Sequence, residues 1–190
     1  MAVREFLARN ARTPHVAGLL VAATAAVFTP MWLLALIALD GAGVVLGESP
    51  FLLAFFLLVT PVNAYAVTRL AWGRWVAGRS VLRPGRAAVV GAVIGVVSFL
   101  TLTVALFLTG HLVAAVSDPH SAAAVVDVPG FLGGLVQFTL LAAAIGLVAT
   151  WGVPVVLSVG VALLLSRLDR QRRNGHGRAR QPREHVRPPR

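Results

Sequence analysis

Four residues of metal-binding type lie close together in one part of the sequence: His111, Asp118, His120 and Asp127. Histidine and aspartate side chains bind zinc and copper in proteins. The spacing of the four matches no metal signature, and the segment 118–121, Asp-Pro-His-Ser, is typical of an ordinary turn. The sequence therefore predicts no metal site in this segment.

Other residues that commonly carry catalysis form no recognised arrangement either. The chain has no cysteine, which excludes disulfides, thiolate nucleophiles and Cys-ligated clusters. It contains no Gly-x-Ser-x-Gly sequence. His15 and His111 lie near opposite ends of apolar stretches, so they cannot both bind one haem. We predict no catalytic residue, no metal and no cofactor, and expect that the protein is not an enzyme.

The elements that carry these residues are long apolar stretches. Only 13% of the 190 residues are charged and 57% are hydrophobic, whereas an average soluble domain has about 25% charged residues. The segments 13–39, 49–68, 87–117 and 128–166 contain no acidic or basic residue other than histidine. A helix needs about 20 apolar residues to cross a membrane. We therefore predict an all-α membrane protein, a bundle of four transmembrane helices.

The distribution of arginine predicts the orientation of this bundle. All 17 basic residues are arginine, a composition typical of a GC-rich genome, and they lie in the N-terminal arm, the segment 69–86 and the tail after residue 166. The two remaining loops carry four acidic residues and no arginine. Because arginine-rich loops stay in the cytoplasm, we predict a multi-pass protein of the bacterial cell membrane with both termini inside.

The expected segments follow from these boundaries. They are a cytoplasmic arm at 1–13, which can form an interfacial helix, a first span at 14–39, an outer loop at 40–49, a second span at 50–69, a basic cytoplasmic loop at 70–86, a third span at 87–112, an outer loop with an interfacial segment at 113–136, a fourth span at 137–166 and a disordered basic tail at 167–190. Pro14 and Pro50 each follow a hydroxyl residue and suit the first position of a helix.

Two of these segments have an alternative interpretation. The first span could be a signal peptide, but its apolar run continues to residue 39, well past the usual length of such a region. The apolar stretch 128–166 is long enough for two spans, but two would place the arginine-rich tail outside. We therefore expect one span, broken or bent at 151–154, because Pro154 removes a helical hydrogen bond.

Small residues recur at four-residue spacing on the predicted spans. Gly18 and Ala22 share one face of the first span, and Gly91 and Gly95 share one face of the third. In lipid, such faces let two helix backbones approach closely. We predict helix packing at these four residues, and the sequence leaves open whether the neighbouring helix belongs to the same chain or to another.

Asn63 is the main polar residue inside the predicted second span. We expect it to form a polar contact between helices, and the alternative is a contact with a solute beside Pro61. The basic loop that follows combines arginine with tryptophan. We expect Arg69, Trp72, Trp75 and Arg79 to lie at the lipid headgroups.

These features favour a partner in or at the membrane. The expected partners are the lipid bilayer with anionic lipids of the inner leaflet, a second copy of the chain or another membrane protein. No specific nucleic acid is expected, because no nucleic-acid-binding fold precedes the basic tail. The hypothesis is a small membrane protein with a non-catalytic role. The alternative hypothesis is a small transporter or channel for an uncharged or lipidic solute.

Overall fold

The computed structural model describes residues 2–39, 50–79, 82–117, 128–149 and 152–179. Within these residues the chain is helical apart from short turns, and no strand occurs among them. The helices are α1 (Ala2–Asn10), α2 (Pro14–Leu39), α4 (Pro50–Trp72), the short π-helix η1 (Gly73–Ala77), α5 (Pro84–Ser117), α7 (Val128–Ala149) and α8 (Val153–Ala179). The all-helical fold matches the class predicted from the sequence.

Proline sets the start of three of the long helices. Pro14, Pro50 and Pro84 are the first residues of α2, α4 and α5. Proline is tolerated at this position because the missing N–H would have no helical partner anyway. α2 and α4 are continuous through Pro30 and Pro61.

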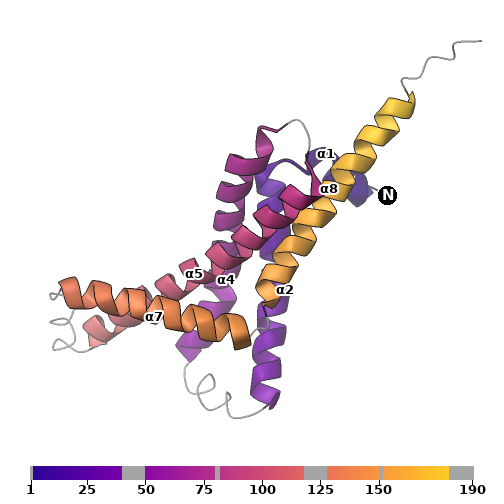
Figure 1. Ribbon diagram of the computed structural model, residues 1–190. Helices are drawn as coiled ribbons and strands as arrows, with labels where there is room; N and C mark the ends of the chain where they lie inside the picture. The colour runs from indigo at the N-terminus through magenta and orange to yellow at the C-terminus, as the bar shows by residue number, and fades with distance from the viewer. Residues whose placement is uncertain (1, 40–49, 80–81, 118–127, 150–151, 180–190) are drawn as a thin grey trace, which may run out of the picture.

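Four helices form a closed ring. α2 packs against α4, α4 against α5, α5 against α8, and α8 returns to α2 (Figure 1). Residues from Ala87 to Phe107 on α5 contribute its buried positions, so the first two thirds of α5 belong to this ring. The helices α2, α4, the first part of α5 and α8 are called the bundle below.

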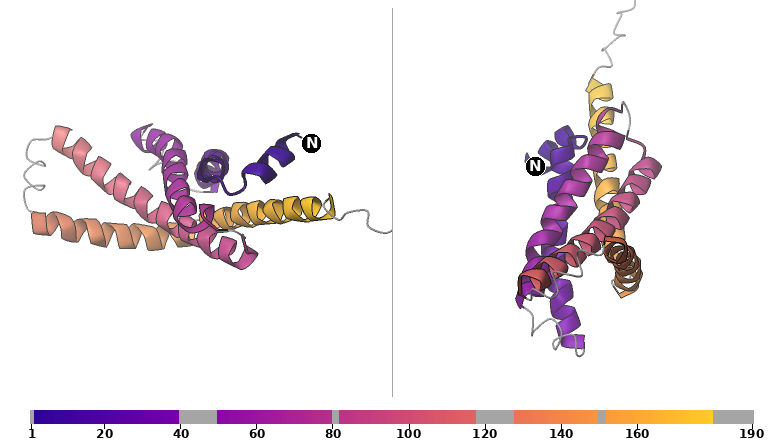
Figure 2. Two further views of the ribbon diagram at one scale, coloured as in Figure 1. Left: turned by 90° about the horizontal axis from the view of Figure 1, so that it is seen from above. Right: turned by 90° about the vertical axis from the view of Figure 1, so that its left-hand side faces the viewer.

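The rest of α5 leaves the bundle and pairs with α7. In the ribbon views this pair projects to one side, and α7 runs crosswise to α2 and α4 (Figures 1 and 2). α7 packs mainly against α5. Phe107 of α5 lies between Phe131 and Phe138 of α7, with ring centroids 5.4 Å from each. The outer part of α5, from about residue 107, and α7 are called the hairpin below.

Three helical segments of the described chain are long and apolar enough to cross a membrane: Pro14–Trp32, Leu53–Ala77 and Pro84–Ser117. They correspond to the first three predicted spans, although the helices continue beyond the expected ends at 69 and 112. The chain is accordingly a membrane protein by the length and composition of its helices.

The expected fourth span, 137–166, is divided between two helices. α7 begins at Val128, nine residues before the expected start, and α8 begins at Val153. Between them Gly152 has a φ of 64°, a left-handed conformation that ends a helix and that glycine adopts without strain. Pro154 falls in the first turn of α8, where its missing N–H is tolerated.

The expectation of disorder from residue 167 is wrong for the first part of the tail. α8 continues as a helix to Ala179. Its continuation packs against α1 through residues such as Gln171 and Arg172, and the end of α8 projects beyond α1 (Figure 1). The prediction of disorder rests on the composition of the tail, which has few apolar residues after Asn174. The helix is supported by contacts with α1, a segment far away in the sequence. Residues 180–190 lie outside the described residues.

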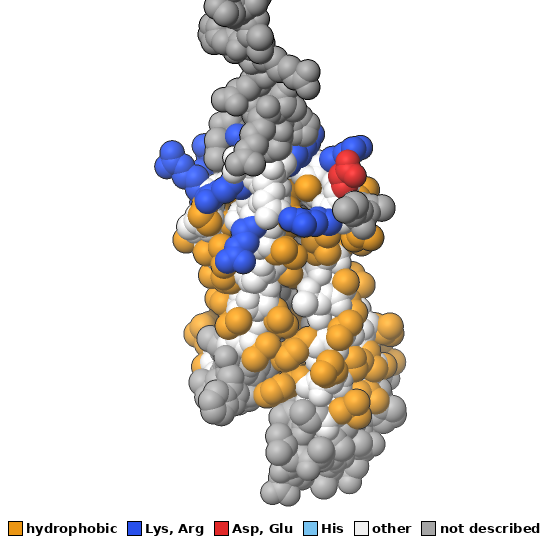
Figure 3. All heavy atoms as spheres, turned by 90° about the vertical axis from the view of Figure 1, so that its right-hand side faces the viewer, with side chains coloured by type: hydrophobic (Ala, Val, Ile, Leu, Met, Phe, Trp, Pro, Cys, Tyr) orange, Lys and Arg blue, Asp and Glu red, His pale blue; other side chains and the backbone are white. Residues whose placement is uncertain are grey.

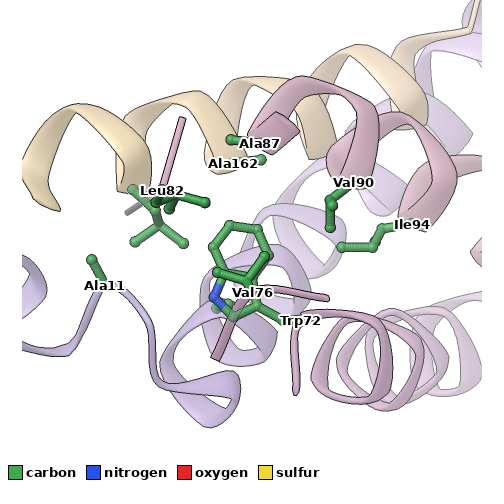
Figure 4. Packing of buried hydrophobic residues seen from close by; sticks show 10 residues of the cluster. Ala11, Trp72, Val76, Leu82, Ala87, Val90, Ile94 and Ala162 are labelled. Atoms are coloured by element: carbon green, nitrogen blue, oxygen red, sulfur yellow. The ribbon is translucent and has the colours of Figure 1, made fainter. Parts of the chain in front are cut away.

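The main buried cluster lies at the end of the bundle near α1 (Figure 4). It combines Trp72, Val76 and Leu82 with Ala11 and with buried residues of α2, α5 and α8, of which the largest are Ile94 and Leu165. The charged residues of the described chain lie at this same end. Burial of apolar side chains away from water stabilises such a cluster.

Candidate functional site at the arginine-rich end

All arginines of the described chain lie at one end of the bundle. They come from α1, the end of α4 with η1, the start of α5, and α8 after Ser166. In the space-filling view the basic side chains form a band at this end, and apolar surface begins directly below it (Figure 3). Segments far apart in the sequence therefore form one strongly basic surface, which is called the arginine end below.

An ion pair between Arg12 and Asp169 lies at the centre of the arginine end. Nε and Nη2 of Arg12 donate to the two carboxylate oxygens of Asp169 at 3.0 and 2.9 Å. Only 8% of the Asp169 side chain and 29% of the Arg12 side chain are exposed. The two parallel hydrogen bonds fix both the distance and the orientation of the two groups.

Arg12 and Asp169 also contact further segments. Nη1 of Arg12 donates to the backbone oxygen of Arg79 at 3.0 Å, and Nε of Arg173 lies 3.5 Å from Asp169 Oδ2. One guanidinium therefore joins the turn after α1, the segment after η1 and α8. The sequence analysis did not single out Asp169, although an isolated acidic residue in an arginine-rich tail is a signal that it has a basic partner.

α1 is joined to α8 by two more hydrogen bonds. Arg4 Nη2 donates to Gln171 Oε1 at 2.7 Å, and Arg172 Nη1 donates to the backbone oxygen of Arg9 at 3.1 Å. On α1 itself, Arg9 forms an exposed ion pair with Glu5. These contacts explain why α8 remains helical where the sequence predicted disorder.

Trp72 does not lie at the headgroups as expected. Its side chain is 1% exposed and belongs to the buried cluster of Figure 4. Its ring Nε1 and the hydroxyl of the fully buried Thr68, one turn earlier, have no hydrogen-bond partner among the described residues. The expectation treated both tryptophans of the loop alike, but the helix continues through η1 and turns Trp72 inward.

The other three residues predicted at the headgroups are exposed. Arg69 and Arg79 are exposed, and 37% of Trp75 is exposed. Their positions are compatible with a headgroup contact, which stays a prediction.

Asn63 joins α4 to α5. Its Nδ2 donates to the backbone oxygen of Ser98 at 2.7 Å, and the hydroxyl of Thr101 lies 2.8 Å from Asn63 Oδ1, within hydrogen-bonding distance. Thr60 and Ser98 have buried hydroxyl oxygens with no partner among the described residues. The arrangement holds two helices together within the apolar part of the bundle.

The glycines predicted to pack helices lie at close contacts within the chain. A Cβ at Gly91 would lie 2.7 Å from the backbone oxygen of Ser158, and a Cβ at Gly95 would lie 2.6 Å from Cα of Val155. The backbones of α5 and α8 therefore touch at these positions, and a side chain would separate them.

The packing residues of α2 face α4. A Cβ at Gly18 would lie 2.9 Å from Cδ2 of Tyr65, whose hydroxyl is 2.7 Å from Nδ1 of His15. Ala22, one turn further along α2, is half-buried.

Of the four residues of metal-binding type, the structure describes only His111. Its Nδ1 donates to the backbone oxygen of Phe107 at 2.9 Å, and its ring packs against Phe107 and Phe131. The other three lie outside the described residues. His15 and His111 lie at opposite ends of the structure's long helices, on α2 and α5.

No family model, no curated protein and no solved structure matches the chain. The function is therefore inferred from the chain's own residues and their arrangement.

Proposed function

We propose that the chain crosses the cell membrane four times, through α2, α4, α5 and α8, with both termini and the segment 70–86 in the cytoplasm. The observation that supports this topology is the gathering of all described arginines at one end of the bundle. Arginine-rich segments are retained on the cytoplasmic side. Segments retained on the same side require an even number of crossings between them.

The fourth crossing is the shortest. The apolar part of α8, residues 153–166, would span about 21 Å, against a hydrocarbon core of about 30 Å. Arg167 at its inner end can extend its guanidinium toward the headgroups, and the crosswise α7 would lie in the outer part of the bilayer. Three helices of ordinary length and one shorter helix can therefore cross the same bilayer.

The sidedness can be tested with single cysteines, because the chain has none of its own. We expect a membrane-impermeant maleimide to label Ser121→Cys in intact cells, whereas Ser80→Cys is labelled only after the membrane is opened. In the sequence, Ser80 lies between η1 and α5, and Ser121 lies between α5 and α7. Labelling of Ser80→Cys from outside would contradict the topology.

We further propose a non-catalytic role, in which the protein packs with a second copy or with another membrane protein through the hairpin. Gly18, Gly91 and Gly95 of the bundle already contact helices of the same chain, but Gly110 and Gly133 in the hairpin have no atom within 4 Å of an added Cβ. Several large apolar side chains of the hairpin are exposed: Leu112, Val116, Leu132, Val136, Leu140 and Leu141. This surface leaves room for the backbone of a neighbouring helix.

Association can be measured by energy transfer between labelled copies in vesicles. Replacement of both Gly110 and Gly133 by Leu is expected to weaken association about tenfold, which corresponds to about 1.4 kcal/mol. Gly160→Leu is the matched control, because Gly160 on α8 also has nothing within 4 Å of an added Cβ. If wild type does not self-associate, the same variants are compared by co-purification of a membrane partner. An unchanged association in the double variant would remove the hairpin as the contact surface.

The second candidate function is a small transporter or channel for an uncharged or lipidic solute. The unpartnered hydroxyls of Thr60 and Ser98 beside Asn63 favour it, because they could bind a polar group of a solute. Against it, the amide of Asn63 is occupied by α5. A variant Asn63→Leu that folds normally and abolishes flux of a solute would support transport over packing.

A further inference from the structure

The arginines whose side chains the structure describes fall into two sets by their contacts. Side chains of the first set contact protein groups: Arg4, Arg9, Arg12, Arg172 and Arg173. Side chains of the second set are exposed and have no partner among the described residues: Arg69, Arg74, Arg79, Arg83, Arg86, Arg167 and Arg170. The second set is called the free arginines below.

No acidic side chain of the described residues is left to neutralise the free arginines. These residues include two acidic groups, Glu5 and Asp169, and both contact arginines of the first set. Seven positive charges therefore lie on one end of the bundle, and their counter-charge must come from outside the described chain. Phosphate suits this role, because a guanidinium donates two parallel hydrogen bonds to it.

The free arginines lie at the boundary between polar and apolar surface. Arg69 is followed by Leu70, which is 74% exposed, and Arg74 is followed by the partly exposed Trp75. Arg86 lies one turn before the exposed Val89 on α5. In Figure 3 the band of basic side chains borders the apolar surface directly. The exposed apolar side chains beside Arg69, Arg74 and Arg86 match the depth at which acyl chains meet headgroups.

The free arginines are also spread over different helices of the bundle. One lies on α4, one on η1, one just after η1, one just before α5, one in the first turn of α5 and two on α8. A nucleic acid or an acidic protein would need them on one face. A lipid surface surrounds the bundle and contacts all of them at once. The charge, the depth and the distribution therefore favour lipid.

We propose that the free arginines bind the phosphate groups of anionic phospholipids in the inner leaflet, while the arginines of the first set hold the arginine end together. This inference rests on the proposed topology, because only that topology places the free arginines at the inner leaflet. It divides one basic surface into residues that bind lipid and residues that stabilise the fold.

The test uses the full chain in phosphatidylcholine vesicles that contain a small amount of spin-labelled lipid. The spectrum gives the preference of the protein surface for phosphatidylglycerol over phosphatidylcholine. Wild type is expected to prefer phosphatidylglycerol. The combined variant Arg69→Gln, Arg74→Gln, Arg83→Gln and Arg86→Gln is expected to lose most of this preference.

The matched control lowers the net charge by the same amount elsewhere. Arg178→Gln, Arg180→Gln, Arg183→Gln and Arg187→Gln also remove four charges, and this variant is expected to keep the wild-type preference. Equal losses in the two variants would overturn the proposal, since net charge alone would then explain the binding. An unchanged preference in the first variant would overturn it as well.

A milder variant covers the case in which the first fails to insert. Arg69→Gln with Arg74→Gln leaves Arg79, Arg83 and Arg86 to retain the loop in the cytoplasm. A smaller loss of preference is expected, and no loss would overturn the proposal. If wild type has no preference although cysteine labelling confirms four spans, this inference fails and the proposed topology stands.

Discussion

The arginine end and the hairpin are held together by different kinds of contact. At the arginine end, Trp72 and Val76 are buried in a cluster, and the ion pair of Arg12 with Asp169 joins three distant segments. In the hairpin, α5 and α7 are joined mainly by rings around Phe107, and long rows of apolar side chains remain exposed. The arginine end has a buried cluster and a buried ion pair that are formed within the chain, and the hairpin leaves much of its apolar surface exposed.

The glycines show the same difference at the level of single residues. Gly91 and Gly95 touch the backbone of α8, whereas Gly110 and Gly133 face open space. All four residues are glycines within apolar stretches of the sequence. The difference teaches that small residues in a membrane helix are not by themselves contact sites, because the contact depends on which helix lies opposite.

The largest effect is expected from replacing a glycine inside the bundle. Gly95→Leu places a side chain where even Cβ would lie 2.6 Å from Val155 Cα, so α5 must move away from α8. The expected loss is about 3 kcal/mol or more in the free energy of unfolding, measured in mild detergent. Gly133→Leu in the hairpin is the control and should change it by less than about 0.5 kcal/mol. Similar losses in the two variants would contradict the comparison.

A smaller effect is expected from breaking the buried ion pair. Asp169→Asn leaves Arg12 without its carboxylate, and the loss should be about 2 kcal/mol, reduced from the value for a fully buried pair because Arg12 is partly exposed. Cleavage by trypsin at Arg167 and Arg170 should become faster as α1 and α8 separate.

Glu5→Gln is the matched control for Asp169→Asn, because it also neutralises one acidic partner of an arginine at the same end. Both side chains of the pair of Glu5 with Arg9 are about two-thirds exposed. Its loss should be no more than about 0.5 kcal/mol. Equal losses in the two variants would contradict the conclusion that the buried ion pair of Asp169 stabilises the fold more than the exposed ion pair of Glu5.

The smallest of the three effects is expected from Asn63, which lies between the two regions. Asn63→Leu removes the hydrogen bonds to Ser98 and Thr101 and should cost about 1 kcal/mol of unfolding free energy. The measurement is again unfolding in mild detergent. Thr109→Val is a suitable control, since Thr109 bonds only within α5. A free energy of unfolding equal to that of wild type would mean that the hydrogen bonds of Asn63 do not stabilise the packing of α4 against α5.

The helical elements could be predicted from the sequence because their signals are local. Runs without charge gave the three long apolar helices, and Pro14 and Pro50 marked the first residues of α2 and α4. Pro154 predicts a break before α8. The position of the break depends also on the left-handed backbone of Gly152, which the sequence composition does not reveal.

The contacts of the arginine end could not be predicted, because they join residues far apart in sequence. Arg12 and Asp169 are separated by 157 positions, and neither residue belongs to a recognisable pattern. Trp72 was expected outside and is buried, because α4 continues to it past the expected boundary at residue 69. Likewise, the start of the tail packs against α1, a contact that its own composition does not reveal.

The ion pair between Arg12 and Asp169 also constrains how the molecule is made. A ribosome synthesises Arg12 early and Asp169 only after α2, α4, α5 and the apolar part of α8 have been translated. Until then Arg12 lacks the carboxylate that it contacts in the folded chain. Closure of the arginine end is accordingly a late event in the formation of this structure, after the helices of the bundle have been translated.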